Sequence, residues 1–424
     1  MKIVQLCGVI EGAGITRYLI EVNNALVLAG HNVVAFDFSE TKQKEANQTL
    51  HNLIRYEFTE EQLNIINSSD LVFVHQLLPK KMSDEYRAQF ENLIKNQITT
   101  KKVLFLNDHS STMTGFSKFY GSNVFTDLEF LNSFDKFCIH CDTNTYAMKL
   151  KNILGEEEFY KRYVNMHHPH HFDDNVINTW RNLNEKYRRI TYIGRWHTIK
   201  HPEQMINMHK HMEGDWEFEM RGIVRLIGLI YTPDLFYEID PNPELKGTKE
   251  CIIGPSKRTF TPSKEWRLQN NYTKDDLLID VPHGDKIWIF GEYKREDGML
   301  AISKSAFGGE FYHLPDSTFY GNNLEYAMHE IIEHGTIPIF DTHAMKSIKY
   351  FENGRPTDKS LYDMNICICL NSDLSNIEEV KEKIEQLYND QDAYNDMRNR
   401  AYKVIKNHCD PIATANTLIE DCLK

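Results

Sequence analysis

The sequence predicts an α/β protein of two Rossmann-like domains, each built on a parallel sheet, followed by C-terminal helices. Short apolar segments rich in Val, Ile and Phe alternate with helical patterns along most of the chain. Such alternation is typical of βαβ units, and near-continuous apolar strands are typical of sheets covered on both faces. The length of 424 residues also fits two domains, since one domain usually has roughly 150 residues.

The strand segments form two series. The first series predicts strands at residues 2–9, 32–38, 70–75, 102–106 and 136–140. The second series predicts strands at residues 189–193, 216–220, 286–290, 336–340 and 366–370. A polar segment that is rich in histidine and broken by proline, residues 166–172, separates them and is typical of a domain boundary. We therefore expect domains at residues 1–170 and 171–400, with helices at 401–424 that pack back on the first domain.

Composition excludes several classes of protein. A net charge of -13, from 48 basic and 61 acidic residues, argues against a protein that coats nucleic acid non-specifically, although a local basic face remains compatible with it. No apolar stretch approaches the ~18 residues of a membrane span, and the first residues run directly into a predicted strand. We expect a soluble, cytoplasmic protein whose eight scattered cysteines are reduced thiols.

The first predicted strand leads into a glycine turn that contains Gly12 and Gly14. Apolar residues at helical spacing follow as far as Gly30. The N–H groups and the positive dipole end of such a helix favour an anion, so the turn predicts a phosphate site. The turn does not match G-x-G-x-x-G, and a plain connection between strand and helix remains an alternative.

The second series opens with a basic turn. Arg195 follows the strand at residues 189–193, and Lys200 comes five residues later. A guanidinium offers bidentate hydrogen bonds and an ammonium a point charge, so both can bind one diphosphate. They would stabilise negative charge on a departing phosphate. Exposed surface charges are the alternative.

Two further features follow in the second half of the chain. Residues 303–310, which include Gly308, are predicted to form a third turn. Glu330 is predicted on a helix, five residues before Gly335, which ends that helix and leads into a strand. A carboxylate in this position can accept hydrogen bonds from both hydroxyl groups of a ribose.

Together these residues resemble the nucleotide-sugar glycosyltransferases of the GT-B fold, in particular their retaining class. The broad class has an acid eight residues before the glutamate, where this chain has Asn322. The resemblance is closer to the DNA alpha-glucosyltransferases of T-even bacteriophages. It rests on residues 10–17 with Glu21, 108–110, 193–195 with Lys200, 220–222 with Arg225, 303–305, 324–326 with Glu330, 335–338, and the helix of Tyr402.

The resemblance implies transfer of a sugar from a UDP-sugar to a hydroxyl group of modified cytosine in duplex DNA, with retention and with the base extruded. The first domain would then bind the DNA acceptor and the second the nucleotide sugar. It implies that Arg195, Lys200, Glu330 and Gly308 bind the donor, and that Gly12 and Gly14 approach the diphosphate or sugar. Glu21 would hold the sugar or the acceptor.

Asp108 is the predicted base or orienting group for the acceptor hydroxyl, with His109 beside it; a helix cap is the alternative for Asp108. The family motif at this position is His-Asp-His, whereas this chain has Asn107 before Asp108. UDP-arabinose is therefore an expected donor beside UDP-glucose.

No metal site is predicted. The D-x-D at Asp390 and Asp392 lies between C-terminal helices, where such residues are typical of turns and caps. Basic side chains and helix dipoles would neutralise the leaving UDP, and a divalent ion would be auxiliary.

A basic segment between residues 246 and 267 is the predicted DNA contact. It has aromatic residues between its charges, as a loop that follows phosphates and wedges between bases would have. The candidate DNA-binding residues are Lys257, Arg258, Lys264 and Arg267 in this segment, and Arg225 outside it. We expect a monomer, in the host cytoplasm if phage-encoded. A GT-B enzyme that acts on a small molecule, glycan or protein is the alternative, which the acidic net charge would suit.

Overall fold

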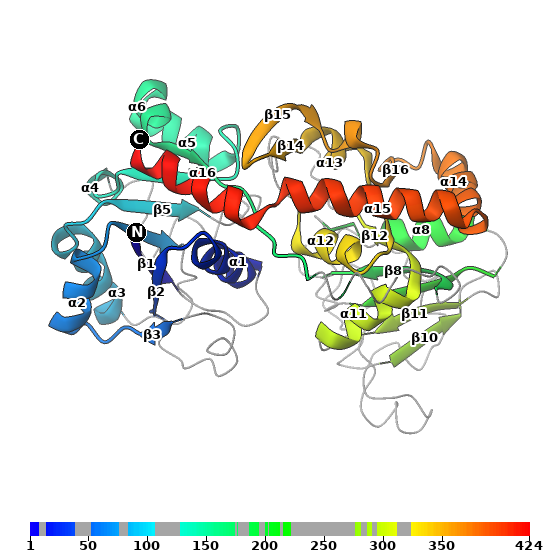
Figure 1. Ribbon diagram of the computed structural model, residues 1–424, viewed down its shortest axis with the longest axis horizontal. Coiled ribbons are helices and arrows are strands. Elements are labelled where there is room, and N and C mark those ends of the chain that lie inside the picture. Colours follow the sequence, from blue (N-terminus) through cyan, green and yellow to red (C-terminus); the bar gives the residue numbers. More distant parts are fainter. Residues whose placement is uncertain are drawn as a thin grey trace.

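The chain folds into two lobes, each built on a seven-stranded sheet (Figure 1). The first sheet belongs to the N-terminal half of the chain and the second to the C-terminal half. The computed structural model describes residues 1–7, 14–38, 52–75, 84–106, 128–173, 176, 186–194, 200–201, 203–212, 215–221, 276–280, 286–290, 295–311 and 324–424.

The first sheet is parallel throughout. Its spatial order is β3 (Leu53–Arg55), β2 (Asn32–Asp37), β1 (Lys2–Cys7), β4 (Leu71–His75), β5 (Lys102–Leu106), β6 (Lys136–Ile139) and β7 (Tyr163–Asn165). The helices of this half are α1 (Gly14–Leu28), α2 (Glu60–Asn67), α3 (Asp84–Asn92) with the π-turn η2 (Leu93–Gln97), α4 (Leu128–Asn132), α5 (Thr145–Leu154) and α6 (Glu156–Arg162).

Alternation along the strands explains why both faces of this sheet are covered. Val4, Leu6 and Val72 point to one face and pack with residues of α2 to α6 and η2. Ile3 and Phe73 point to the other face and pack with residues of α1. Burying one large apolar side chain contributes roughly 1.5–3 kcal/mol, so both faces need helices over them.

The second sheet is parallel except at one edge, where β10 is antiparallel to β11. Its order is β10 (Asp276–Asp280), β11 (Lys286–Phe290), β9 (Glu217–Arg221), β8 (Tyr187–Ile193), β12 (Ser305–Glu310), β13 (Ile337–Asp341) and β16 (Ile368–Leu370). The other elements of this half are α8 (Glu203–His211), α11 (Arg295–Lys304), α12 (Tyr326–Glu333), α13 (Thr342–Ser347), the hairpin β14 (Lys349–Glu352) and β15 (Arg355–Ser360), η7 (Tyr362–Met364) and α14 (Ile377–Asn389).

The last two helices connect the lobes. In Figure 1, α15 (Gln391–His408) runs along the C-terminal lobe, and α16 (Pro411–Leu423) continues over the N-terminal lobe, where both chain ends lie. The two helices are separated at Asp410, whose carboxylate accepts a hydrogen bond from the Ala413 N–H at 2.8 Å and caps α16. Leu418 and Ile419 then join the apolar cluster under α1. The helix α15 continues through residue 401, the position of the predicted domain boundary.

The structure confirms the predicted GT-B architecture and the predicted strands, with ends that shift by at most two residues within the described segments. The strands that were not predicted are β3, β7, β10, β12, β14 and β15. Asp390 caps α15 through the Ala393 N–H, as its predicted role requires.

The predicted third turn at residues 303–310 is wrong, because residues 305–310 form β12 near the centre of the second sheet. Small residues are needed there for packing. A Cβ atom at Gly308 would lie 2.8 Å from Cγ2 of Ile331 on α12, and one at Gly309 would lie 2.8 Å from Sδ of Met205 on α8. Gly308 therefore lies inside a buried strand and not in a loop.

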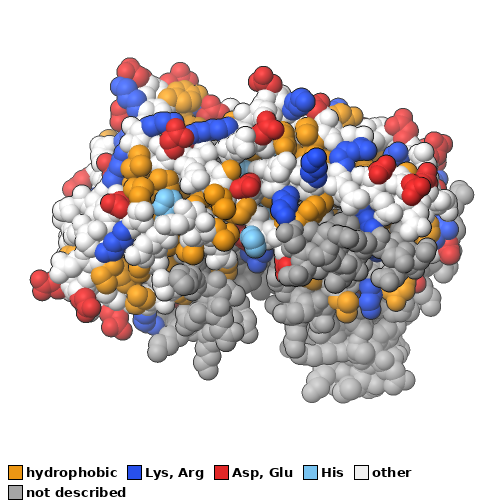
Figure 2. Space-filling view, in the orientation of Figure 1, with side chains coloured by type: hydrophobic (Ala, Val, Ile, Leu, Met, Phe, Trp, Pro, Cys, Tyr) orange, Lys and Arg blue, Asp and Glu red, His pale blue; other side chains and the backbone are white. Residues whose placement is uncertain are grey.

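On the face shown in Figure 2, basic and acidic side chains of the described residues are interspersed rather than gathered by sign. No helix within the described segments is long and apolar enough to cross a membrane. Seven cysteines are described, and all are free thiols.

Candidate active site

Charged side chains mark the carboxyl edge of the second sheet. The strands β9, β12 and β13 end at Arg221, Glu310 and Asp341. Ligands of open α/β sheets bind outside the carboxyl ends of the strands, because loops and helix N-termini converge there. The predicted donor residues should therefore lie at this edge.

Lys200 lies between two carboxylates at this edge. Its Nζ atom is 3.2 Å from Oε1 of Glu310, which is fully buried, and it also pairs with Glu325, the residue before α12. These three side chains together carry one negative formal charge, so a further cation nearby would favour the binding of a diphosphate. Arg195, the predicted second cation, lies outside the described residues.

Sequence reasoning missed both acidic partners of Lys200. Glu310 is separated from Lys200 by 110 positions along the chain, and no local pattern connects them. Their positions carried a signal, since Glu310 ends the glycine-containing strand and Glu325 precedes the helix of Glu330. Both are acids next to an element already assigned to the donor site.

Glu330 lies on α12, as predicted, and its side chain is half-buried. Its backbone carbonyl accepts a hydrogen bond from the His334 N–H at 3.1 Å. Gly335 follows with φ of 69°, a left-handed conformation that ends the helix and directs the chain into β13. The helix thus starts beside Lys200 and carries Glu330 one turn further on.

Two of the predicted phosphate sites follow strands that the structure describes. The strand β1 ends at Cys7 and α1 begins at Gly14, so the predicted strand and helix are confirmed, while Gly12 between them lies outside the described residues. After β8, Gly194 has φ of 157° and donates its N–H to the Arg221 carbonyl at 3.0 Å. This hydrogen bond holds the chain beside β9 one residue before Arg195.

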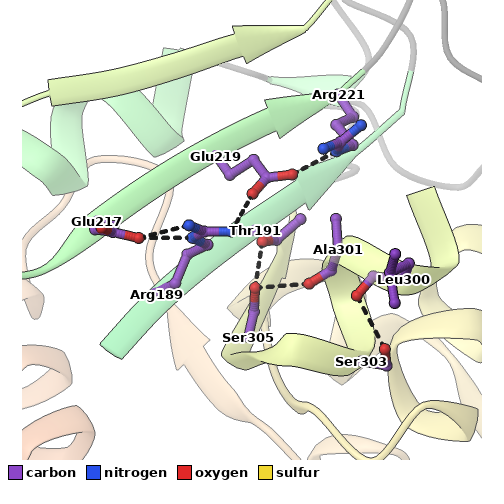
Figure 3. A network of polar contacts seen from close by, with 9 residues as sticks. All are labelled: Arg189, Thr191, Glu217, Glu219, Arg221, Leu300, Ala301, Ser303 and Ser305. Carbon is purple, nitrogen blue, oxygen red and sulfur yellow. Dashed lines mark hydrogen bonds and ion pairs between the residues drawn. The ribbon is translucent and has the colours of Figure 1, made fainter. Parts of the chain in front are cut away.

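A row of alternating charges runs along β8 and β9 toward this edge (Figure 3). Arg189 donates to Glu217 at 2.6 and 2.9 Å and to Glu219 at 2.5 Å, and Glu219 also pairs with Arg221. Glu219 is almost fully buried, and two guanidinium partners offset the cost of burying its charge. The row holds Arg221 at the strand end.

Hydrogen bonds also tie β12 to its neighbours (Figure 3). The hydroxyl groups of Thr191 and Ser305 are 2.6 Å apart, and Ser305 donates to the Ala301 carbonyl at 2.9 Å. Both hydroxyl groups are fully buried, so these bonds avoid the cost of unpaired polar groups. They fix the strand that presents Glu310.

Glu21 lies on α1, and 5% of its surface is exposed. It pairs with Nη2 of Arg17 at 2.6 Å and with Nδ1 of His170 at 3.4 Å. The hydrogen bond with His170 and the Arg17 charge outweigh burial, which alone would raise the pKa of Glu21, so this pKa is below its ordinary value. The carboxylate is thus ionised and held by protein groups; a contact with sugar or acceptor stays a prediction.

Several predicted residues lie outside the described residues, so their roles stay predictions. They are Gly12, Asp108, His109, Arg195, Arg225, Lys257, Arg258, Lys264 and Arg267. Within the described segments, no three His, Cys, Asp or Glu side chains form a group that could hold a metal ion.

The structure does not cluster four further basic residues that could have contributed to a DNA-binding surface. Arg188 and Arg189 lie on β8, and Lys101 and Lys102 lie at the start of β5 in the other sheet. Arg188 donates to Glu385 at 2.5 Å, and Lys101 donates to the Leu423 carbonyl at 3.2 Å. These side chains serve contacts within the protein.

Comparisons with known proteins show what the chain is similar to in sequence and fold. No family model matches the chain. The DNA alpha-glucosyltransferase of Enterobacteria phage T4 is 20% identical over 430 residues, which cover 95% of this chain and 94% of that protein. A structure of alpha-glucosyltransferase in complex with UDP has a TM-score of 0.73 at 18% identity, with full coverage of both chains. A structure of alpha-glucosyltransferase with UDP-glucose and DNA containing an abasic site has a TM-score of 0.69 at 18% identity, and covers 100% of this chain and 99% of that one. The resemblance predicted from the sequence is confirmed.

Proposed function

We propose that this chain, which is similar along nearly its whole length to the DNA alpha-glucosyltransferase of phage T4, is a UDP-sugar-dependent DNA glycosyltransferase. It transfers glucose, or a pentose such as arabinose, to the hydroxyl group of a hydroxymethylated or hydroxylated cytosine in duplex DNA, with retention. The observation that carries the proposal is Lys200, held by Glu310 and Glu325 at the carboxyl edge of the second sheet.

The reaction needs charge stabilisation at this edge. The bond between the anomeric carbon and the β-phosphate oxygen breaks, and its electron pair leaves with UDP. Lys200 and Arg195 stabilise the charge that develops on this oxygen. When UDP brings its negative charges, the ammonium of Lys200 can turn from one of its two carboxylates to the diphosphate.

The remaining donor contacts come from both lobes. Glu330 accepts hydrogen bonds from the ribose hydroxyls, while Gly12 and Gly14 let the start of α1 approach the diphosphate or the sugar. In the acceptor, the hydroxyl oxygen forms the new bond to the anomeric carbon, and its proton passes to Asp108, with His109 beside it. A displacement on one face of the sugar gives retention without a protein nucleophile.

The acceptor hydroxyl belongs to a base that is stacked inside duplex DNA. An enzyme reaches such an atom when the base leaves the stack, which costs a few kcal/mol. Lys257, Arg258, Lys264, Arg267 and Arg225 are the proposed phosphate contacts, so duplex binding should weaken as salt rises.

A donor screen tests the proposal. The protein is incubated with UDP-glucose or UDP-arabinose and with duplexes that contain either 5-hydroxymethylcytosine or cytosine, and nucleosides are analysed by mass spectrometry. We expect a sugar adduct on the hydroxymethylated duplex only. Absence of an adduct with every UDP-sugar, together with no salt-sensitive duplex binding, would contradict the proposal and favour a small-molecule, glycan or protein acceptor.

The variant Arg195→Ala tests the diphosphate role within the same assay. We expect transfer to fall by about 100-fold or more, because a donor aimed at developing charge is lost. Arg400→Ala, at an exposed site on α15, is the matched control and should keep full activity. Undiminished transfer in Arg195→Ala would remove this residue from the site.

A further inference from the structure

His170 lies between carboxylates from the two lobes. Its Nδ1 atom is 3.4 Å from Oε1 of Glu21 on α1, and its Nε2 atom is 3.3 Å from Oε2 of Glu333 on α12. The imidazole is 1% exposed and each carboxylate 5%. Nε2 is hydrogen-bonded to Glu333, while Nδ1 lies at ion-pair distance from Glu21. A carboxylate facing each nitrogen favours the protonated ring, in which both nitrogens carry a proton.

The backbone on either side of His170 is held as well. Its N–H donates to the Cys409 carbonyl at 3.0 Å, at the junction of α15 and α16. The His171 N–H lies 3.4 Å from Oε2 of Glu21, and the Asp173 N–H donates to Oε1 of Glu333 at 2.8 Å. The segment between the domains is therefore fixed to both lobes, which places the imidazole between them.

The charged and titratable groups around His170 come from three elements. They are Arg17 and Glu21 on α1, Tyr326, His329 and Glu333 on α12, and the Cys409 thiol after α15. Burial raises the pKa of the Cys409 thiol and of Tyr326, and lowers that of His329, so these three are neutral. Arg17 and the imidazolium of His170 then balance the two carboxylates.

Burial alone would lower the pKa of His170, but the contacts with the carboxylates of Glu21 and Glu333 outweigh it and raise this pKa above its ordinary value. The pKa of Glu333 is lowered: burial acts to raise it, and the His170 contact outweighs that effect. A raised pKa in the folded state contributes stability that is complete below the unfolded value of about 6.5 and is lost as the pH rises through the folded value.

We propose that His170 is a positioning residue which, as an imidazolium, clamps α1 of the first lobe to α12 of the second. The helix α1 begins at the glycine turn, and α12 starts beside Lys200 and carries Glu330. The clamp therefore sets the distance between the two halves of the donor site. The role of this clamp in sugar transfer rests on the proposed function.

The variant His170→Gln tests the clamp, because glutamine is neutral and leaves two buried carboxylates facing one cation. We expect kcat to fall about tenfold or more, since a misplacement of about 1 Å between reacting groups can cost ~100-fold. The KM for the UDP-sugar should stay within about twofold of the wild-type value, because most donor contacts lie in one lobe. His211→Gln, at an exposed site on α8, is the matched control.

A double variant distinguishes the loss of the His170 charge from the loss of its packing. In His170→Gln with Glu333→Gln the cluster is neutral again, and the amide at position 333 still accepts from the Asp173 N–H. We expect this double variant to recover most of the lost stability and part of kcat. Should the single variant fail to fold, recovery of folding in the double variant supports the clamp, and failure in both overturns it.

Wild-type stability should decline as the pH rises above about 6.5, and this decline should be absent from His170→Gln. The same pH profile in wild type and His170→Gln, or no recovery in the double variant, would overturn the proposal. Thermal unfolding needs no acceptor. A wild type that transfers no sugar to DNA would therefore refute the proposed function and leave the clamp to be judged by unfolding alone.

Discussion

At their carboxyl ends, the central strands β1 and β4 of the first sheet carry a different kind of side chain from β9, β12 and β13 of the second. In the second sheet, β9, β12 and β13 end at Arg221, Glu310 and Asp341. In the first sheet, β1 ends at Cys7 and β4 ends at His75, and both are buried. Burial raises the pKa of Cys7 and lowers the pKa of His75 to about 3, so both groups are neutral at physiological pH.

A chain of neutral hydrogen bonds supports the first edge. Nε2 of His75 lies 2.9 Å from Oε1 of Gln5, and Gln5 donates to Asn23 on α1 at 3.0 Å. All three side chains are buried. The ends of β9, β12 and β13 therefore suit a charged diphosphate, while the ends of β1 and β4 suit an uncharged group such as a base or a hydroxyl. The charged strand ends of the first sheet, Asp37 on β2 and Arg55 on β3, lie toward one side of that sheet.

The largest expected effect comes from removing a cation from the carboxyl edge of the second sheet. In Lys200→Met, we expect kcat/KM for the UDP-sugar to fall about 100- to 1,000-fold, because a cation aimed at developing charge is removed. Steady-state kinetics with hydroxymethylated duplex measure it. Lys359→Met, at an exposed site on β15, is the control.

The loss of Lys200 also leaves buried Glu310 with one partner fewer, which itself destabilises the protein. The double variant Lys200→Met with Glu310→Gln removes that buried charge. It should regain stability but not activity. Recovery of transfer in this double variant would show that Lys200 serves folding alone.

The next largest effect comes from removing the neutral hydrogen bonds at the carboxyl edge of the first sheet. In Gln5→Leu, both His75 and Asn23 lose a partner, and a buried unpaired polar group costs about 1–3 kcal/mol. We expect the free energy of unfolding to fall by this amount in urea titrations, with an unchanged KM for the UDP-sugar. Gln89→Leu, at an exposed site on α3, should change neither. A raised KM would mean that this edge of the first sheet also binds the donor.

A smaller effect appears on acidification. Because the pKa of His75 is about 3 when folded and about 6.5 when unfolded, the unfolded chain binds an additional proton between these values. Stability should therefore fall as the pH drops below about 6.5, by up to ~1.4 kcal/mol per pH unit for this group. Urea titrations at pH 5 and pH 7 measure it. His75→Gln should reduce the difference, and an equal difference in both proteins would contradict the neutral assignment.

The smallest effect concerns metal removal. If basic side chains supply the charge at the second edge, treatment with EDTA should lower transfer by less than about tenfold. A metal that polarises a leaving oxygen is worth several kcal/mol, so its removal would abolish activity. Transfer in EDTA and in added Mg²⁺ distinguishes these cases.

Local composition predicted the strands well. The strands β5 and β11 have the predicted bounds, since short apolar segments between polar ones are strand signals wherever they occur. The segment of β12 was mistaken for a turn because Gly308 and Gly309 are typical of turns. Their function there is to admit Ile331 and Met205 closely, and those contacts depend on tertiary packing.

The site was predicted in part. The placement of Lys200 near a strand end, and of Glu330 on a helix before Gly335, follows from local order along the chain. The partners of Lys200 do not, because Glu310 lies 110 positions away. The segment at residues 166–172 was predicted as a polar linker, yet His170 is buried between carboxylates.

By itself, the sequence determined which segments are strands or helices and which face of each is apolar, because periodicity records a local choice between core and solvent. Tertiary structure alone decided that His170 meets Glu333 across 163 positions. An apolar face or a buried charge specifies that it needs a partner, and the packing of the whole chain selects that partner.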